Sequence, residues 1–191
     1  MIDLAYIQEW HNAWQESVDR LSEGLIASKE DGLTVLILGV VFHLLILCLL
    51  GAVAITDART QEIPNRLNLL LLGCGVLSLF IWPQITLLSH LIGLVCISVP
   101  MGAIALLAPG SFGMGDVKLM GACGLLLGWE RILVALLIGI VIGGLQGVYF
   151  ICTHRKSRKE HFAFGPALCI GISIALFAGR MLFDSYLALL V

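Results

Sequence analysis

Long apolar runs separated by short polar gaps occupy most of this chain. The runs are continuous rather than alternating, and six of them cover about 33–55, 67–82, 85–107, 117–129, 132–152 and 162–181. A membrane-spanning helix needs roughly 20 apolar residues, whereas a membrane-spanning strand needs only about 9–11 in an alternating pattern. The pattern therefore predicts an all-α polytopic membrane protein with about six transmembrane helices, contained in residues 33–191.

A different pattern precedes the first apolar run. Residues 1–32 hold seven acids and two bases. Apolar side chains recur there every three or four residues, which gives a helix one apolar face. They are Ile7, Trp10, Trp14, Val18, Leu21 and Leu25. We expect an acidic, amphipathic tail rather than a signal peptide, because a signal peptide begins with basic residues. The tail either rests on the bilayer surface or docks on a protein partner.

Composition narrows the class of protein further. Hydrophobic residues make up 59% of the chain and charged residues 13%, whereas soluble domains average about 45–50% apolar and about 25% charged. These values exclude a soluble enzyme, a disordered tail and a nucleic-acid binder. The six cysteines lie in or at the ends of apolar runs, and no two have CxxC spacing. We therefore expect neither a zinc site nor a redox pair, and no cofactor.

The positions of Lys and Arg predict which way the helices face. Seven of the eleven bases fall in the gaps at 56–66, 108–118 and 152–161, which lie on one side of a six-helix arrangement. Loops rich in Lys and Arg remain in the cytoplasm. We therefore expect these three gaps to be cytoplasmic and both termini to lie outside the cytoplasm.

Two aspartates at the ends of apolar runs are the first candidates for chemistry. Asp57 follows the first run and Asp116 precedes the fourth, so both lie on the cytoplasmic side in the predicted topology. A charged side chain at the centre of a bilayer costs about 2.5–3.5 kcal/mol on insertion scales. An acid close to the hydrocarbon is therefore a candidate functional residue.

The helix expected after each aspartate is too short to cross the bilayer alone. The run after Asp116 covers about 18 Å and the run at 67–82 covers about 24 Å of a hydrocarbon core about 30 Å thick. Either the bilayer thins at these helices or the two loops dip inward. Irregular backbone at that depth is tolerated only where it lines a cavity or is covered by protein. We therefore expect both aspartates to face one wet pocket on the cytoplasmic side.

Two carboxylates that share a pocket repel each other, so one keeps its proton while the other is ionised. The ionised member can accept a proton from water, and the protonated member can donate a hydrogen bond to a carbonyl oxygen. Such a pair can hydrolyse a peptide bond without a metal or a covalent intermediate. The residues alone leave a cation site or a proton site open as well.

The residues around these aspartates resemble the two signatures of the type IV prepilin peptidases, which are membrane aspartic proteases of the GxGD type. The first signature is Asp57 followed by Ile63-Pro64-Asn65, and the second is Gly113-Met114-Gly115-Asp116-Val117-Lys118-Leu119. Phe164-Gly165-Pro166, before the last apolar run, is similar to the last-helix motif of that family. The resemblance covers about residues 33–180.

This resemblance implies a leader peptidase of the bacterial inner membrane, with an active site that faces the cytoplasm. Its substrates would be prepilins or pseudopilins of type IV pili or secretion systems, cut after a glycine between a short basic leader and a hydrophobic helix. Asp57 and Asp116 match the catalytic pair, although the base and the acid are not assigned. Lys118 matches the motif lysine, with an electrostatic or structural role.

Larger members of that family carry paired CxxC motifs and also N-methylate the new N-terminus. This sequence contains no such motifs, so it resembles the shorter, peptidase-only branch, and we expect no methyl transfer by this chain.

Gln146 is a further candidate because it lies about two turns from the inner end of the fifth run. It either contacts water or the substrate backbone or makes an interhelical hydrogen bond. Two other functions also stay open. One is a GxGD protease that cuts other single-span substrates within the bilayer, and the second is a proton- or ion-coupled transporter. The transporter would be favoured by inverted repeats, and the sequence shows no convincing pair of halves.

Overall fold

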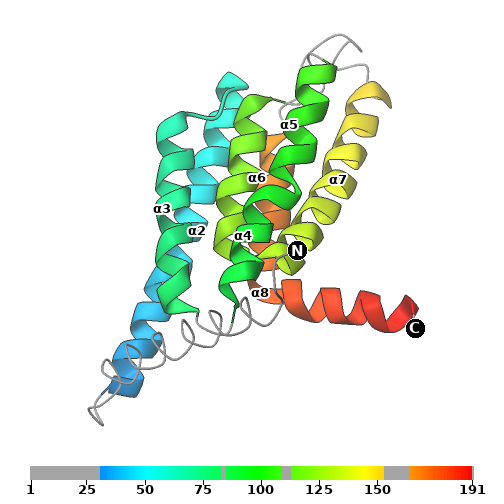
Figure 1. The fold of residues 1–191 in the computed structure, drawn as a ribbon. Coiled ribbons are helices and arrows are strands. Elements are labelled where there is room, and N and C mark those ends of the chain that lie inside the picture. Colours follow the sequence, from blue (N-terminus) through cyan, green and yellow to red (C-terminus); the bar gives the residue numbers. More distant parts are fainter. Residues whose placement is uncertain (1–30, 83–84, 109–112, 153–163, 191) are drawn as a thin grey trace, which may run out of the picture.

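A computed structural model describes residues 31–82, 85–108, 113–152 and 164–190. All regular structure in these ranges is helical, which confirms the predicted all-α class (Figure 1). The helices are α2 (Asp31–Thr60), α3 (Asn65–Ile81), α4 (Leu87–Cys96), α5 (Ser98–Leu107), α6 (Met114–Leu127), α7 (Trp129–Cys152) and α8 (Gly165–Leu190). The acidic tail lies outside the described residues except for its last two positions, and it stays a prediction.

Four helical stretches in the described ranges are long and apolar enough to cross a membrane. They are Ile37–Thr60, Leu87–Leu107, Trp129–Tyr149 and Gly165–Tyr186. Large apolar side chains such as Leu69, Phe80 and Leu145 are more than half exposed on the outside of the bundle. A surface of this kind is suited to lipid rather than to water. The structure is therefore that of a polytopic membrane protein, and the side that each end faces stays a prediction.

The single helix predicted over 85–107 is two helices. α4 ends at Cys96 and α5 begins at Ser98. Pro100 explains the break, because proline has no N–H and its ring conflicts with the carbonyl four residues earlier, which is that of Cys96. Helical bonding resumes at once, since the N–H of Met101 donates to the carbonyl oxygen of Ile97 at 3.0 Å.

The last helix also differs from its prediction over 162–181. α8 begins at Gly165 and continues to Leu190. Its C-terminal part turns away from the bundle axis at the end of the bundle where α2 begins (Figure 1).

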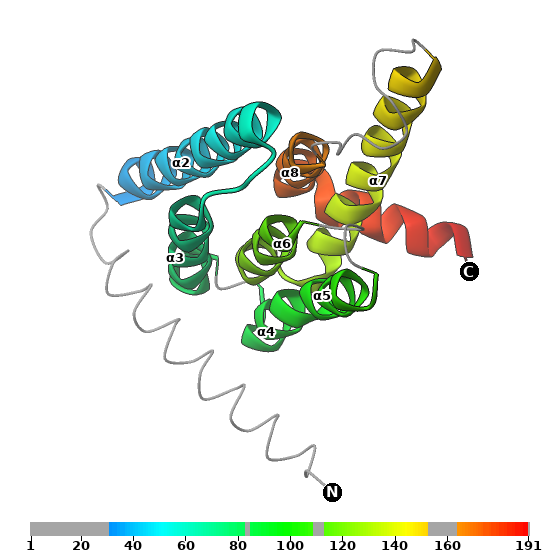
Figure 2. The same cartoon turned by 90° about the horizontal axis from the view of Figure 1, so that it is seen from above.

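α6 is the central helix of the bundle. It packs against α3, α4, α5, α7 and α8, which surround it when the bundle is viewed from above (Figure 2). From Asp116 to Leu127, every residue of α6 except Lys118 is buried. This short helix is 14 residues long, as the sequence indicates, and protein rather than lipid covers it.

A pair of glycines sets how closely α4 approaches α6. A Cβ atom added to Gly93 would overlap the carbonyl oxygen of Gly124, and one added to Gly124 would overlap the carbonyl oxygen of Gly93. Small residues at a helix crossing allow backbones to approach closely in membranes. The position of α6, and of the aspartate at its start, therefore depends on this crossing.

We expect Gly124→Ala to destabilise the protein by about 1–3 kcal/mol, because the added methyl group must displace backbone rather than a side chain. The measurement is the thermal unfolding midpoint in detergent. Gly73→Ala on α3 is the matched control, because no atom lies within 4 Å of a Cβ built there. The control should be neutral or more stable by up to about 1 kcal/mol. Equal midpoints for both variants would contradict this account.

Candidate active site

Several helices begin or end at the same end of the bundle. α2, α5 and α7 end there, and α3, α6 and α8 begin there (Figure 1). The two aspartates singled out by the sequence lie on two of these helix ends, Asp57 on α2 and Asp116 on α6. Both side chains are almost completely buried, with 5% and 7% of their surface exposed. The wet pocket expected around them stays a prediction.

Asp57 lies in the last turn of α2. The helix ends because Gln61 adopts a left-handed conformation, with φ at 57°. The N–H of Gln61 donates to the carbonyl oxygen of Asp57 at 2.8 Å, which is the usual 5→1 bond of a left-handed helix cap. This cap fixes the backbone of Asp57 at the C-terminal end of the helix.

The carboxylate of Asp57 is held by the first residue of α8. The backbone N–H of Gly165 donates to Oδ2 of Asp57 at 3.0 Å. The first N–H groups of a helix have no partner within the helix and attract anions. A Cβ atom at position 165 would lie only 2.5 Å from Oδ2 of Asp57. Glycine is therefore required here by the close approach of the carboxylate.

Pro166 is compatible with this arrangement. It is the second residue of α8, where a backbone N–H would have no partner within the helix. The first intrahelical bond of α8 joins the N–H of Leu168 to the carbonyl oxygen of Phe164 at 3.1 Å. Phe164 thus directly precedes the last helix, Gly165 and Pro166 begin it, and the N–H of Gly165 donates to Asp57.

Asp116 is the third residue of α6, and its carboxylate turns back over the start of that helix. The backbone N–H of Gly113 hydrogen-bonds to the Asp116 side chain, as the third helical residue does in a capping box. The charges of Asp116 and Asp57 interact electrostatically. The structure therefore brings together two acids that are 59 positions apart in the sequence.

The two signature motifs also contact each other. A Cβ atom on Gly115 would lie 3.0 Å from Cβ of Ile63, so glycine allows α6 to begin directly against this residue. On the exposed side, Nζ of Lys118 donates to Oδ1 of Asn65 at 2.9 Å. Pro64 is the residue that directly precedes α3.

Asn68 is a contact residue that the sequence analysis missed. Its Nδ2 donates to the carbonyl oxygen of Gly115 at 3.2 Å. Its Oδ1 is buried and has no hydrogen-bond partner among the residues described. The only sequence signal is a polar side chain within an otherwise apolar run, one turn after the Ile63-Pro64-Asn65 motif.

Cys169 is the second residue that was missed. It lies on α8 one turn after Gly165, it is 3% exposed, and its thiol interacts electrostatically with both Asp57 and Asp116. The sequence places all six cysteines in or at the ends of apolar runs, and Cys169 is indeed buried in the core. Its proximity to both acids depends on how α8 packs, which no local sequence pattern indicates.

Gln146 is half-buried on α7. No hydrogen bond joins it to either aspartate in the described ranges, and its predicted contact with water or substrate stays a prediction. Within those same ranges, no three His, Cys, Asp or Glu side chains are grouped so that they could hold a metal ion.

Comparison with known proteins assigns the chain to a family. The model of the type IV leader peptidase family matches residues 44–148, which include both aspartates and both signature motifs. The chain belongs to this family. No solved structure matches it.

Three curated relatives of this type IV leader peptidase family member are named prepilin leader peptidase/N-methyltransferase. The Bacillus subtilis protein is 29% identical over 73% of this chain and 56% of its own length. The Legionella pneumophila protein is 30% identical over 85% of this chain and 58% of its own length. The Escherichia coli protein is 29% identical over 96% of this chain and 82% of its own length. The chain thus spans little more than half of the first two relatives.

We expect Gly165→Ala to destabilise this family member by about 1–3 kcal/mol, because the methyl group must displace the Asp57 carboxylate. In an Asp57→Ala background, Gly165→Ala should lower the unfolding free energy much less. The two atoms nearest to the added Cβ, which are Oδ2 and Cγ of Asp57, are absent from that variant. The measurement is a double-mutant cycle of unfolding free energies in detergent. Strictly additive effects would show that the two residues do not interact.

Proposed function

We propose that this protein is a membrane aspartic endopeptidase that removes the leader from prepilin-like precursors. The observation that supports this function best is the pairing of Asp57 and Asp116. Both acids are buried, both accept a backbone N–H at the start of a helix, and their charges interact. A carboxylate pair of this kind suits general acid–base hydrolysis of a peptide bond.

The proposed reaction uses one carboxylate and one carboxylic acid. The ionised member accepts a proton from a water molecule as the water oxygen attacks the scissile carbonyl carbon. The protonated member donates its proton to the carbonyl oxygen, which gives a neutral tetrahedral intermediate. When this intermediate collapses, the aspartate that took the proton from water gives it to the leaving nitrogen and the C–N bond breaks. One hydroxyl of the intermediate returns its proton to the other aspartate as the new carbonyl forms, so the pair regains its starting protonation state. The backbone N–H groups of Gly165 and Gly113 keep the carboxyl groups in position throughout.

The substrate class follows from family membership. The relatives carry the name prepilin leader peptidase/N-methyltransferase, and we propose prepilins or pseudopilins as substrates of this chain. The proposal covers leader cleavage alone, and methyl transfer is no part of it.

The proposed location is the bacterial inner membrane, with the dyad at the cytoplasmic face. Arg59 lies in the last turn of α2, Arg66 in the first turn of α3 and Lys118 two residues after Asp116 on α6. These helix ends lie together at one end of the bundle (Figure 1). Basic residues at the ends of membrane helices favour the cytoplasmic side. The acidic tail at 1–32 would then lie on the opposite face, available to the bilayer surface or to a partner protein.

We expect Asp57→Asn and Asp116→Asn each to reduce leader cleavage by at least about 10²–10⁴-fold, because each removes one half of the proton transfer. The assay mixes purified protein in detergent with a prepilin and follows cleavage on a gel. Unfolding midpoints close to wild type would show that both variants fold. Cleavage that survives either substitution would defeat the two-aspartate mechanism, and no cleavage of any prepilin by wild type would favour the intramembrane-protease or transporter function.

We expect Lys118→Ala to lower cleavage by much less, roughly fivefold, because its exposed hydrogen bond to Asn65 contributes about 1 kcal/mol. Asn65→Ala should have a similar effect, and the double variant should be no worse than either single one. The same cleavage assay measures all three. Complete loss of activity in a folded Lys118→Ala protein would show that this lysine takes part in the chemistry.

A further inference from the structure

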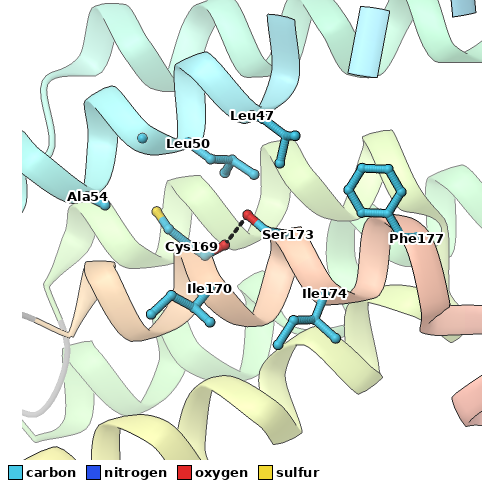
Figure 3. A pocket seen from close by; sticks show the side chains of 9 residues that line it. Leu47, Leu50, Ala54, Cys169, Ile170, Ser173, Ile174 and Phe177 are labelled. Atoms are coloured by element: carbon cyan, nitrogen blue, oxygen red, sulfur yellow. Dashed lines mark hydrogen bonds between the residues drawn. The ribbon is translucent and has the colours of Figure 1, made fainter. Parts of the chain in front are cut away.

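An apolar groove runs between α2 and α8 on the outside of the bundle. It has a volume of about 420 Å³. Side chains from the two helices face each other across it, with Leu47, Leu50 and Ala54 on α2 and Ser173 and Phe177 on α8 (Figure 3). Phe177 is 67% exposed and Ile174 is 40% exposed, so the groove is open towards the space that lipid would occupy.

The lining of the groove offers little to a polar ligand. The only hydroxyl among the lining side chains belongs to Ser173, and it donates to the carbonyl oxygen of Cys169 on its own helix at 2.7 Å (Figure 3). The other lining side chains are apolar. A hydrocarbon surface such as the apolar face of a helix therefore fits this groove better than a peptide strand with unpaired backbone groups does.

One end of the groove lies close to Asp57 along both helices. Ala54 lies one helical turn before Asp57 on α2, and Cys169 lies about one turn after Gly165 on α8. Cys169 both lines the groove and interacts electrostatically with the two carboxylates. The groove therefore ends about one helical turn from Asp57 and from the residue that holds its carboxylate.

From this adjacency we propose that the groove binds the hydrophobic helix of the same precursor whose leader the two aspartates remove. The inference rests on the proposed function and adds the place where the uncut part of the substrate lies. The substrate helix would start at the dyad and run beside α8 in the same direction, antiparallel to α2. Its first residues would contact Cys169 and Ala54, and later ones Leu47 and Phe177.

The length of the groove limits which part of the substrate helix it contacts. Leu47 is ten residues before Asp57, and Phe177 is twelve residues after Gly165. At 1.5 Å per residue these positions are about 15–18 Å from the dyad. The groove therefore contacts about the first ten to twelve residues of the substrate helix, and apolar residues on one face of that segment provide the recognition.

Gly51 gives a direct test because it lines the groove and no atom lies within 4 Å of a Cβ built there. We expect Gly51→Phe to fill the groove and reduce cleavage at low substrate concentration by at least roughly tenfold, mainly through a higher KM. Gly73→Phe is the matched control, since Gly73 is equally free of neighbours but lies on α3. It should stay within about twofold of wild type. Unfolding midpoints of both variants establish that they fold.

A second measurement locates the substrate without relying on activity. p-Benzoylphenylalanine replaces Ile174 in the groove or, as a control, Leu69 on the outside of α3, which is 68% exposed. Both proteins carry Asp116→Asn so that the precursor stays intact. Illumination should cross-link the precursor from position 174, through the first twelve residues of its helix, and at least roughly tenfold less from position 69.

These results separate the groove from the function on which it rests. Failure of the wild type to cleave any precursor overturns the proposed function. Cleavage by the wild type together with undiminished cleavage by Gly51→Phe overturns the groove alone. Cross-links from position 174 only to lipid, to a second copy of this chain or to its residues 1–30 also overturn the groove, as do equal yields from both positions.

Discussion

The hydrogen bond from the backbone of Gly165 to the carboxylate of Asp57 holds the active end of this bundle together. Asp57 lies at the C-terminal end of α2, where the helix dipole disfavours a negative charge. The N-terminal end of α8 has the opposite polarity and supplies an unpaired N–H to the same carboxylate. Glycine at 165 allows the two helices to meet at this distance. This contact joins α2 to α8 at the end of the bundle, beyond the groove that lies between the two helices.

The second carboxylate is placed by a different constraint, the depth of α6. A helix of 14 residues covers about 21 Å of a hydrocarbon core about 30 Å thick. Its start must therefore be covered by protein, and Ile63, Asn65 and Asn68 cover it from the side of α3. The crossing of Gly93 with Gly124 supports the same helix from the side of α4. Asp116 can thus lie near Asp57 because neighbouring helices surround α6, which is too short to cross the bilayer by itself.

The sequence predicts the parts of this structure that depend on local chemistry. In lipid a backbone must satisfy its own hydrogen bonds, so each long apolar run predicts a helix. An acid next to such a run is costly, and for that reason Asp57 and Asp116 stand out from the other acids of the chain. The break at Ile97 lies in an unbroken apolar run, and Pro100 was its only signal.

Contacts between distant segments could not be predicted in the same way. Gly165 and Asp57 are 108 residues apart, and no pattern along the chain indicates that a helix start and a helix end will meet there. Asn68 looks like one polar exception in an apolar helix, and Cys169 looks like one small hydrophobic residue among six. Their roles come from the packing of α3 and α8 against α6, which local propensity does not encode.

The position of the two aspartates at helix ends also fits the proposed substrate. A peptide bond in the middle of a helix is protected, because its carbonyl and N–H groups bond within the helix. At the start of a helix the first four N–H groups have no such partners, and the chain before them is not yet helical. A substrate helix bound in the proposed groove would begin close to Asp57 and Asp116. In the proposed complex, the apolar part of the precursor would remain in contact with lipid and with α2 and α8, while only its extended end would enter the polar site. The proposed cleavage would therefore require no unwinding of the substrate within the bilayer core.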